Sequence, residues 1–138
     1  MIFNRLACFI FCFALSSLAH AEETKLFKVE TTLSRRKVKI GEATNLSVKI
    51  IALAPAKINK EAPMALELKP NVNLTYPKFK FAKSDAKKSD DREIQWEISL
   101  KALKAGNHQI EGHLSFYLCT DKWCRKFETD FSEKIESN

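Results

Sequence analysis

The stretch FYLCTDKWCRKF, residues 116–127, decides the fold that we expect for this chain. Its two cysteines, Cys119 and Cys124, enclose four residues, and loops of four residues are common in β-hairpins. If Cys119 lies opposite Cys124, then Phe116 lies opposite Phe127 on the other face of the hairpin. A slip of one residue would expel one phenylalanine from the core face, so the pattern predicts this register.

The predicted register also orders the residues around the cysteines. It places on their face the cross-strand pairs Tyr117–Lys126, Ser115–Glu128 and His113–Asp130. Directly opposed residues of antiparallel strands have Cα atoms about 4.5–5.5 Å apart, which is within the range that a disulfide accepts. We therefore expect a disulfide between Cys119 and Cys124. We interpret His113 and Asp130 as a cross-strand charge pair.

The first residues of the chain have the pattern of a secretion signal. Arg5 precedes an apolar run over residues 6–19, and Ala19-His20-Ala21 fits the small-x-small rule for cleavage. The run is shorter than the roughly 20 apolar residues that a membrane-spanning helix needs. Residues 1–21 are thus a predicted signal peptide, and residues 22–138 a single domain in a periplasmic or secreted protein. Cleavage after Ala21 would remove Cys8 and Cys12 and leave one cysteine pair.

The composition argues against several classes of function. The chain has 23 lysines and arginines against 17 acidic residues, for a net charge of +6. The lysines are scattered along the sequence, which is typical of a solvated surface and not of a nucleic-acid interface. Only 3 glycines are present, which leaves little room for a phosphate-binding loop, and no set of serine, histidine and carboxylate stands out. We expect no cofactor and no nucleic-acid partner.

Alternation of apolar and polar residues recurs beyond the hairpin, and no window sustains helical periodicity. It is clearest over residues 27–33, 46–53, 94–100, 108–118 and 124–135, where Trp96 takes a core position. Residues 56–81 are less regular, and their parity changes at Pro77, which indicates an edge strand or a bulge. The pattern predicts an all-β fold, an antiparallel immunoglobulin-like β-sandwich of seven to eight strands, with a small barrel as the alternative.

The cysteine pair is open to three interpretations: a redox pair, a structural staple or part of a metal site. As a staple, it would close a loop of about six residues and stabilise the fold by roughly 2 kcal/mol. As a redox pair, it would be accessible at the hairpin tip, where Lys122, Arg125 and Lys126 favour the thiolate. For a metal site, His113 lies roughly 20 Å along the strand from Cys119, too far to share an ion.

The loop between the cysteines carries Trp123, which also has two interpretations. An exposed tryptophan at a reactive tip would suit docking to a partner, because aromatic side chains often anchor interfaces. The alternative is that Trp123 folds back over the disulfide and shields it.

The run GHLSFYLCTDKWC, residues 112–124, with the Ala105-Gly106 turn before it, resembles the end of a known domain. It is similar to the N-terminal periplasmic domain of the DsbD family of transmembrane thiol:disulfide interchange proteins, which is an immunoglobulin-like sandwich. In that family a strand ends in the first cysteine, a small residue and an aspartate often follow, and the second cysteine begins the last strand. Cys119, Asp121 and Cys124 match these elements, with four intervening residues where the family usually has five.

The resemblance implies that Cys119 and Cys124 cycle between dithiol and disulfide. Electrons would come from a thioredoxin-like protein and pass to periplasmic oxidoreductases. We expect Cys124 to attack and Cys119 to resolve the mixed disulfide, because the basic side chains cluster on the side of Cys124. Residues expected to dock the partner or shape the tip are Tyr117, Asp121, Lys122, Trp123 and Lys126. The competing interpretation is a non-catalytic immunoglobulin-like binding module with a structural disulfide.

Overall fold

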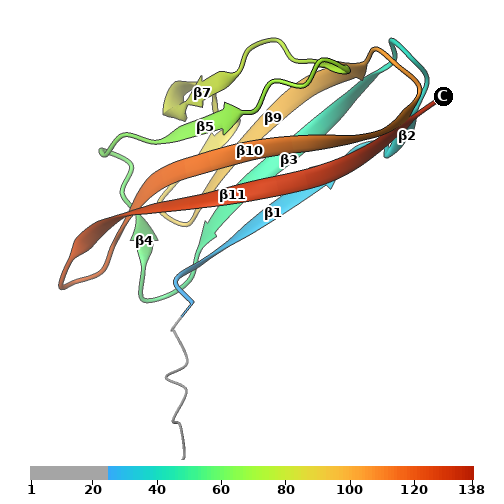
Figure 1. The fold of residues 1–138 in the computed structure, drawn as a ribbon. Coiled ribbons are helices and arrows are strands. Elements are labelled where there is room, and N and C mark those ends of the chain that lie inside the picture. Colours follow the sequence, from blue (N-terminus) through green and yellow to red (C-terminus); the bar gives the residue numbers. More distant parts are fainter. Residues whose placement is uncertain (1–24) are drawn as a thin grey trace, which may run out of the picture.

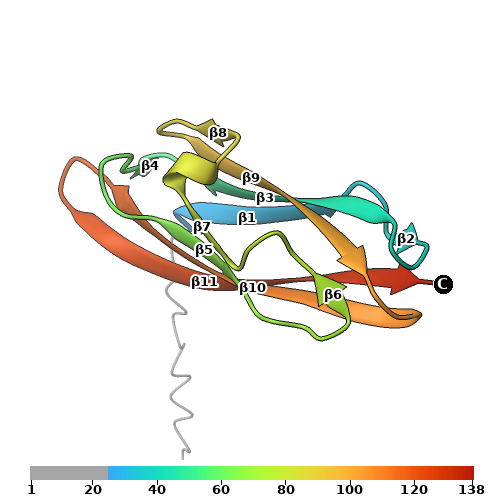
Figure 2. The ribbon, with the colours of Figure 1, turned by 90° about the horizontal axis from the view of Figure 1, so that it is seen from above.

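The computed structural model describes residues 25–138, which fold as two β-sheets packed face to face (Figures 1 and 2). The predicted signal peptide, with Cys8 and Cys12, lies outside the described residues. In the first sheet are β1 (Phe27–Leu33), β3 (Ala43–Ala52), β9 (Glu93–Ala102), β6 (Leu74–Thr75) and β8 (Lys88–Ser89). In the second are β2 (Lys37–Val38), β11 (Cys124–Ser137), β10 (Gly106–Cys119), β5 (Ala65–Leu68), β7 (Lys80–Ala82) and β4 (Lys57–Ile58).

The predicted all-β, immunoglobulin-like sandwich is confirmed. The order β1-β3-β9 in one sheet and β5-β10-β11 in the other is the arrangement of such a sandwich. The described part of the chain has 11 strands, more than the seven to eight expected, because four of them have only two residues; the other 7 have three residues or more. One detail differs from the prediction, because β2 pairs with β11 in parallel, whereas the other pairs are antiparallel.

The core lies between the sheets and consists of the alternating apolar side chains that the sequence indicated. Trp96 of β9 and Phe116 of β10 are fully buried, as are the inward residues of β3. The indole N–H of Trp96 donates a hydrogen bond to the carbonyl oxygen of Ala82 at 2.9 Å, so its polar atom is satisfied. The core position predicted for Trp96 is therefore confirmed.

The hairpin of β10 and β11 has the predicted register over its whole length. Cys119 lies opposite Cys124, and Phe116 lies opposite Phe127. The rings of Phe116 and Phe127 stack with their centroids 6.2 Å apart, on the face that packs against the first sheet. The 14-residue strands form a long ladder that extends past the body of the sandwich at the loop end (Figure 1).

The middle of the chain differs from the single edge strand or bulge expected around Pro77. The segment forms two short strands, β6 and β7, which belong to different sheets. Pro77 lies between them, where the chain leaves the first sheet for the second, because a proline cannot donate to a ladder. A 3-10 turn, Lys83–Asp85, follows β7. No helix in the described part of the chain is long and apolar enough to cross a membrane.

One close approach in the second sheet requires a glycine. An ideal Cβ built on Gly112 would lie under 3.0 Å from ring carbon atoms of Phe131, the residue opposite on β11. Phe131 is itself buried, at 7% exposure, so its ring has little room to move. The ring of Phe131 thus occupies the space that a side chain at residue 112 would need.

We expect the substitution Gly112→Ala to lower the free energy of unfolding by about 1–3 kcal/mol, because the added methyl group overpacks the site. Urea denaturation of the purified domain measures the loss. The double variant Gly112→Ala/Phe131→Leu should recover part of it, because leucine vacates the space of the ring tip. If the double variant lost as much free energy of unfolding as Gly112→Ala and Phe131→Leu lose together as single variants, the close packing would be contradicted.

Candidate functional site at the cysteine hairpin

Cys119 and Cys124 form a disulfide with an S–S distance of 2.03 Å and Cα atoms 4.1 Å apart. The pair closes the ladder at the base of the four-residue loop. In the loop, the backbone N–H of Thr120 donates to the carbonyl oxygen of Trp123 at 2.8 Å. Adjacent pairs of an antiparallel ladder alternate in hydrogen bonding, so the cysteines occupy a non-hydrogen-bonded pair, in which side chains lie closest. The predicted disulfide is confirmed.

The two cysteines differ in their surroundings. Cys119 ends β10, a strand with neighbours on both sides, because Lys57 of β4 lies opposite it on the side away from β11. Cys124 begins β11, and no strand pairs with the outer edge of this part of β11 within the described residues. Cys119 is half-buried, whereas Cys124 is exposed. An attacking molecule can therefore reach Cys124 more easily than Cys119.

The face that carries the disulfide also carries three of the side chains around it. Lys57, Cys119 and Cys124 form a row across three adjacent strands, and Tyr117 and Lys126 form the next pair along the hairpin. Directly paired residues point to the same face, so all five share one surface. The site residues Tyr117 and Lys126 thus accompany the cysteines as the sequence indicated.

Lys57 is a member of this site that the sequence analysis missed. Residues 56–59 lie in the irregular middle of the sequence, where alternation does not identify a partner strand. The structure pairs Lys57 with Cys119, and it also joins Asn59 to Tyr117 through a backbone hydrogen bond of 2.9 Å. The exposed lysine adds a positive charge beside the cysteine pair, and such a charge favours a thiolate.

Arg125 lies on the other face of the hairpin, contrary to the expected cluster of three basic side chains beside Cys124. Its guanidinium carbon is 4.6 Å from the centroid of the Trp123 ring, a cation–π geometry. Trp123 is half-buried, and its ring lies 6.2 Å from that of Phe127. Trp123, Arg125 and Phe127 have the same parity, opposite to that of Cys124, so Trp123 packs along the hairpin on the side away from the disulfide.

The end of the loop carries the two remaining predicted site residues. Asp121 and Lys122 are both exposed, and the backbone N–H of Lys122 donates to the hydroxyl oxygen of Thr120 at 3.2 Å. This local turn directs both charged side chains into solvent at the tip. Among the described residues, neither side chain forms a hydrogen bond with Cys119 or Cys124.

A row of charged side chains continues from the cysteines along the same face. Lys126 lies 3.3 Å from Glu128, which lies 3.7 Å from His113, and the Nδ1 atom of His113 lies 2.7 Å from the Oδ1 atom of Asp130. The cross-strand pair predicted for His113 and Asp130 is therefore confirmed. The hydrogen bond to Asp130 raises the pKa of His113, and the hydrogen bond from Lys126 lowers the pKa of Glu128.

These charges are paired with one another along the face. In residues 25–138, no three or more histidine, cysteine or acidic side chains come together in a way that could hold a metal ion. His113 stands opposite Asp130, six residues along the strand from Cys119.

Neither a family model nor a curated protein matches the chain. Among solved structures, the chain is similar to the major subunit of aggregative adherence fimbriae type I, AggA, from Escherichia coli. The two share 11% sequence identity with a TM-score of 0.44, and the match covers 86% of this chain and 100% of the other.

We expect the pKa of His113 to lie above its usual value of 6.5, because the Asp130 carboxylate accepts a hydrogen bond from the protonated ring. The pair then stabilises the fold fully below about pH 6.5, and this contribution is lost as the pH rises through the raised pKa. An NMR titration of the imidazole ring measures the pKa. Asp130→Asn should lower it toward the usual value, whereas the matched change Asp121→Asn at the loop tip should not. If the pKa of His113 were the same in the Asp130→Asn and Asp121→Asn variants, the pairing would be contradicted.

Proposed function

We propose that this domain is an exported thiol:disulfide exchange module that relays electrons through Cys119 and Cys124. Its partners are thioredoxin-like proteins and other oxidoreductases of the periplasm or the extracellular space. The proposal rests on the position of the disulfide and on the resemblance of the hairpin sequence to the DsbD N-terminal domain.

The observation that carries the proposal is that the disulfide lies at the exposed end of a ladder that is already continuous. It joins residues with a sequence separation of 5, in strands that pair over 14 residues each. Closing such a short loop contributes only about 2 kcal/mol, whereas a disulfide between the sheets would restrain far more chain. The bond can thus open without removing the contacts that hold the sandwich together, which is what a reversible redox pair requires.

The proposed reaction is a pair of exchange steps. In the reduced domain, the Cys124 thiolate attacks a disulfide of an oxidised partner, forms a mixed disulfide and releases one partner thiolate, which takes up a proton. The Cys119 thiolate then attacks Sγ of Cys124, forms the Cys119–Cys124 bond and releases the second partner thiolate. Two electrons and two protons pass to the partner, and a reduced thioredoxin-like protein restores the dithiol by the reverse sequence.

The assignment of Cys124 as the attacking thiol follows from exposure. Cys124 lies on the open edge of β11, whereas Cys119 is half-buried between β11 and β4. A bulky protein disulfide needs an accessible nucleophile, but the resolving step needs only a thiol that is already in contact. Both lysines share the face of the cysteines: Lys57 lies opposite Cys119 on β4, and Lys126 follows Cys124 on β11, where it also pairs with Glu128. A lysine near each cysteine favours its thiolate.

The second candidate function is a binding module in which the disulfide fixes a recognition loop. It is favoured by the stack of Arg125 on Trp123 at the hairpin end, because arginine and tryptophan are common anchors of interfaces. In this case the disulfide would be a permanent part of the fold. The two functions differ in whether the native domain exchanges its disulfide.

We expect the disulfide of the native domain, residues 22–138, to have a reduction potential between about −300 and −120 mV, the range of periplasmic and thioredoxin-like carriers. Equilibration in defined thiol buffers, followed by alkylation with a mass tag, measures it. As a control, Cys119→Ala/Cys124→Ala should lose no more than about 2 kcal/mol of unfolding free energy. A disulfide that stays oxidised below this range, or is reduced only after unfolding, would exclude the relay and leave the binding module.

We expect two lysine variants to separate the two exchange steps when the reduced domain reacts with oxidised glutathione. Lys126→Glu should slow formation of the mixed disulfide at Cys124, and Lys57→Glu should slow its resolution by Cys119, each by roughly two- to fivefold, because a nearby carboxylate disfavours a thiolate. Mass spectrometry of quenched samples follows the mixed disulfide. Lys104→Glu, at the far end of the sandwich, is the matched control for charge. If Lys57→Glu slowed formation of the mixed disulfide and Lys126→Glu slowed its resolution, the attack would be assigned to Cys119.

A further inference from the structure

The sandwich has an open side next to the cysteine hairpin, where the two sheets meet without pairing. β1 is the terminal strand of the first sheet, and β11 pairs along this side only with β2, at Glu136 and Ser137. Along this open side, β1 and the first half of β11 run next to each other in the same direction (Figure 1). The hydroxyl of Thr31 bonds to Glu133 at 2.8 Å near the end that β2 closes, and the other end stays open.

A groove of about 680 Å³ lies at this open end. Its size falls within the range of about 300–1,000 Å³ that is common for binding clefts. On the side of β1 it is lined by the consecutive residues 25–29, and on the side of β11 by the alternate residues Arg125, Phe127 and Thr129. Consecutive residues present the edge of a strand, whereas alternate residues present one face. The groove therefore combines the backbone edge of β1 with a wall of β11 side chains.

The backbone groups along the edge of β1 that faces the groove are free to pair. The carbonyl oxygen of Leu26 accepts from the N–H of Leu53, and the N–H of Ser34 donates to Asn45, so even-numbered residues bond to β3. The odd-numbered residues must then direct their N–H and C=O groups the other way, toward the groove. For Phe27 and Val29, no partner strand takes these groups within the described residues. Such an edge is a template for an added strand.

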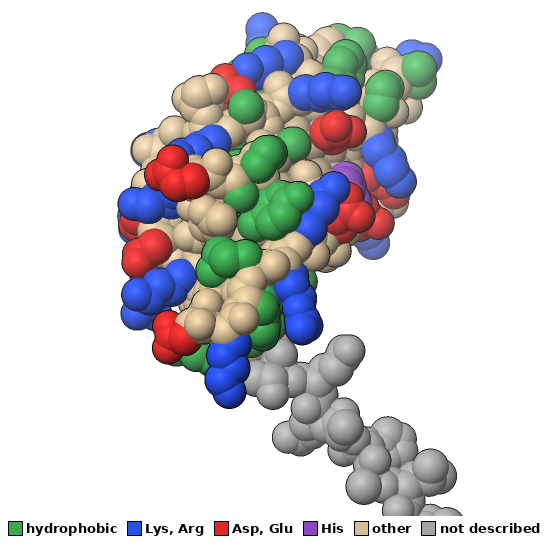
Figure 3. Space-filling model, turned by 90° about the vertical axis from the view of Figure 1, so that its left-hand side faces the viewer, with side chains coloured by type: hydrophobic (Ala, Val, Ile, Leu, Met, Phe, Trp, Pro, Cys, Tyr) green, Lys and Arg blue, Asp and Glu red, His purple; other side chains and the backbone are tan. Residues whose placement is uncertain are grey.

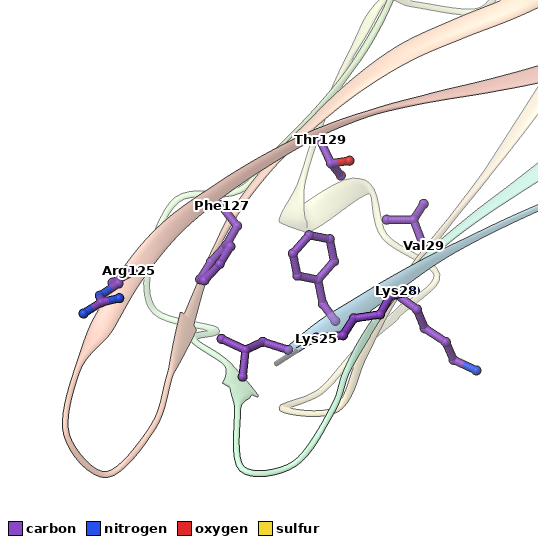
Figure 4. A pocket seen from close by; sticks show the side chains of 8 residues that line it. Lys25, Lys28, Val29, Arg125, Phe127 and Thr129 are labelled. Carbon is purple, nitrogen blue, oxygen red and sulfur yellow. The ribbon is translucent and has the colours of Figure 1, made fainter. Parts of the chain in front are cut away.

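The side chains of the groove indicate the chemistry of the occupant. Its floor is apolar, because Phe27, Val29 and Phe127 are half-buried there and the rings of Phe27 and Phe127 meet at 5.6 Å. Its margins are basic, because Lys25, Lys28 and Arg125 line it and no carboxylate does; of these, Lys28 also pairs with Glu30 beside the groove at 3.0 Å. Figure 4 shows Phe127 reaching from β11 toward β1, with Arg125 and Lys28 on either side, and Figure 3 shows hydrophobic side chains between lysines and arginines at this end.

We propose that this groove binds an extended, acidic segment of a partner protein, which adds as a strand to the free edge of β1. Alternate apolar side chains of the segment would cover Phe27 and Phe127, and its carboxylates would meet the basic margins. This binding step does not depend on exchange at the disulfide, and it would bring a bound partner beside Arg125 and the cysteine hairpin.

The test uses the oxidised domain and three fluorescent peptides of about eight residues, the length of an ordinary strand, with valine alternating with glutamate, serine or lysine. Fluorescence anisotropy measures the affinities. We expect the valine–glutamate peptide to bind about tenfold or more tightly than the valine–lysine peptide, with a marked salt dependence. Equal binding of the three peptides, or no binding of the acidic one, would overturn the proposal.

Amide hydrogen exchange in the unmodified domain then locates the peptide. The bound acidic peptide should slow exchange at the amides of Phe27 and Val29 by about tenfold or more, because these groups gain partners. Protection elsewhere on the surface would overturn the proposal. The same amides could instead become protected without peptide, in a dimer that forms as the protein concentration rises. That result would assign the groove to a second copy of the chain and would also overturn the proposal.

Two sets of variants complete the test. Val29→Pro removes an edge donor without removing a bond to β3, and it should abolish binding of the acidic peptide while circular dichroism shows the fold intact. Lys25→Glu/Lys28→Glu should weaken that binding by about tenfold or more. The matched control Lys101→Glu/Lys104→Glu carries the same charge change on exposed lysines at the other end of the sandwich. If both double variants weakened binding of the acidic peptide equally, the binding would depend only on net charge, and the proposal would be overturned.

Discussion

The ladder between β10 and β11 is the constraint on which the second sheet depends. β10 is its central strand, because β11 pairs along one side and β4 and β5 pair along the other. The burial of Phe116 and the half-burial of Phe127 fix the register, since a shift of one residue would turn the inward side chains to solvent. The same register brings Cys119 opposite Cys124, and the separate pairing of β4 with β10 places Lys57 beside Cys119. The positions of the two cysteines, Tyr117 and Lys126 therefore follow from the apolar face of one hairpin.

The open side of the sandwich arises from the way in which the chain changes sheets at its beginning. β1 pairs with β3, but a few residues later β2 pairs with the end of β11, so this segment closes the two sheets together at one end only. Arg36 and Thr31 both bond to Glu133 and tie the closed end. Toward the cysteine hairpin no strand pairing joins the sheet edges in residues 25–138, and apolar side chains of both sheets line the gap. The groove and the disulfide are therefore neighbours because both lie at the end that β2 does not close.

The sequence was informative where a residue pattern alone determines the partner of a strand. Alternation in β10 and β11, with a cysteine at each inner end, was enough to predict their register and the face of each side chain. The short strands around residues 57–82 are different, because their pairing depends on neighbours distant in the chain, and Pro77 marks only a break between them. Lys57 was missed for this reason. The face of Arg125 also follows from the register, because Arg125 is the residue after Cys124, whereas its stacking on Trp123 depends on the conformation of the loop.

The asymmetry of the two cysteines suits the exchange that we propose for this hairpin. Cys119 belongs to a strand with neighbours on both sides, so its backbone stays in place whether or not the disulfide is closed. Cys124 lies one strand further out, where an approaching molecule meets no further strand. Because the pairs that follow along the ladder hold the two strands together, opening the S–S bond releases only the four-residue loop. A sulfur that is reachable and a second that is held beside it are the two requirements of exchange through a mixed disulfide, and the different places of β11 and β10 in the sheet supply one each.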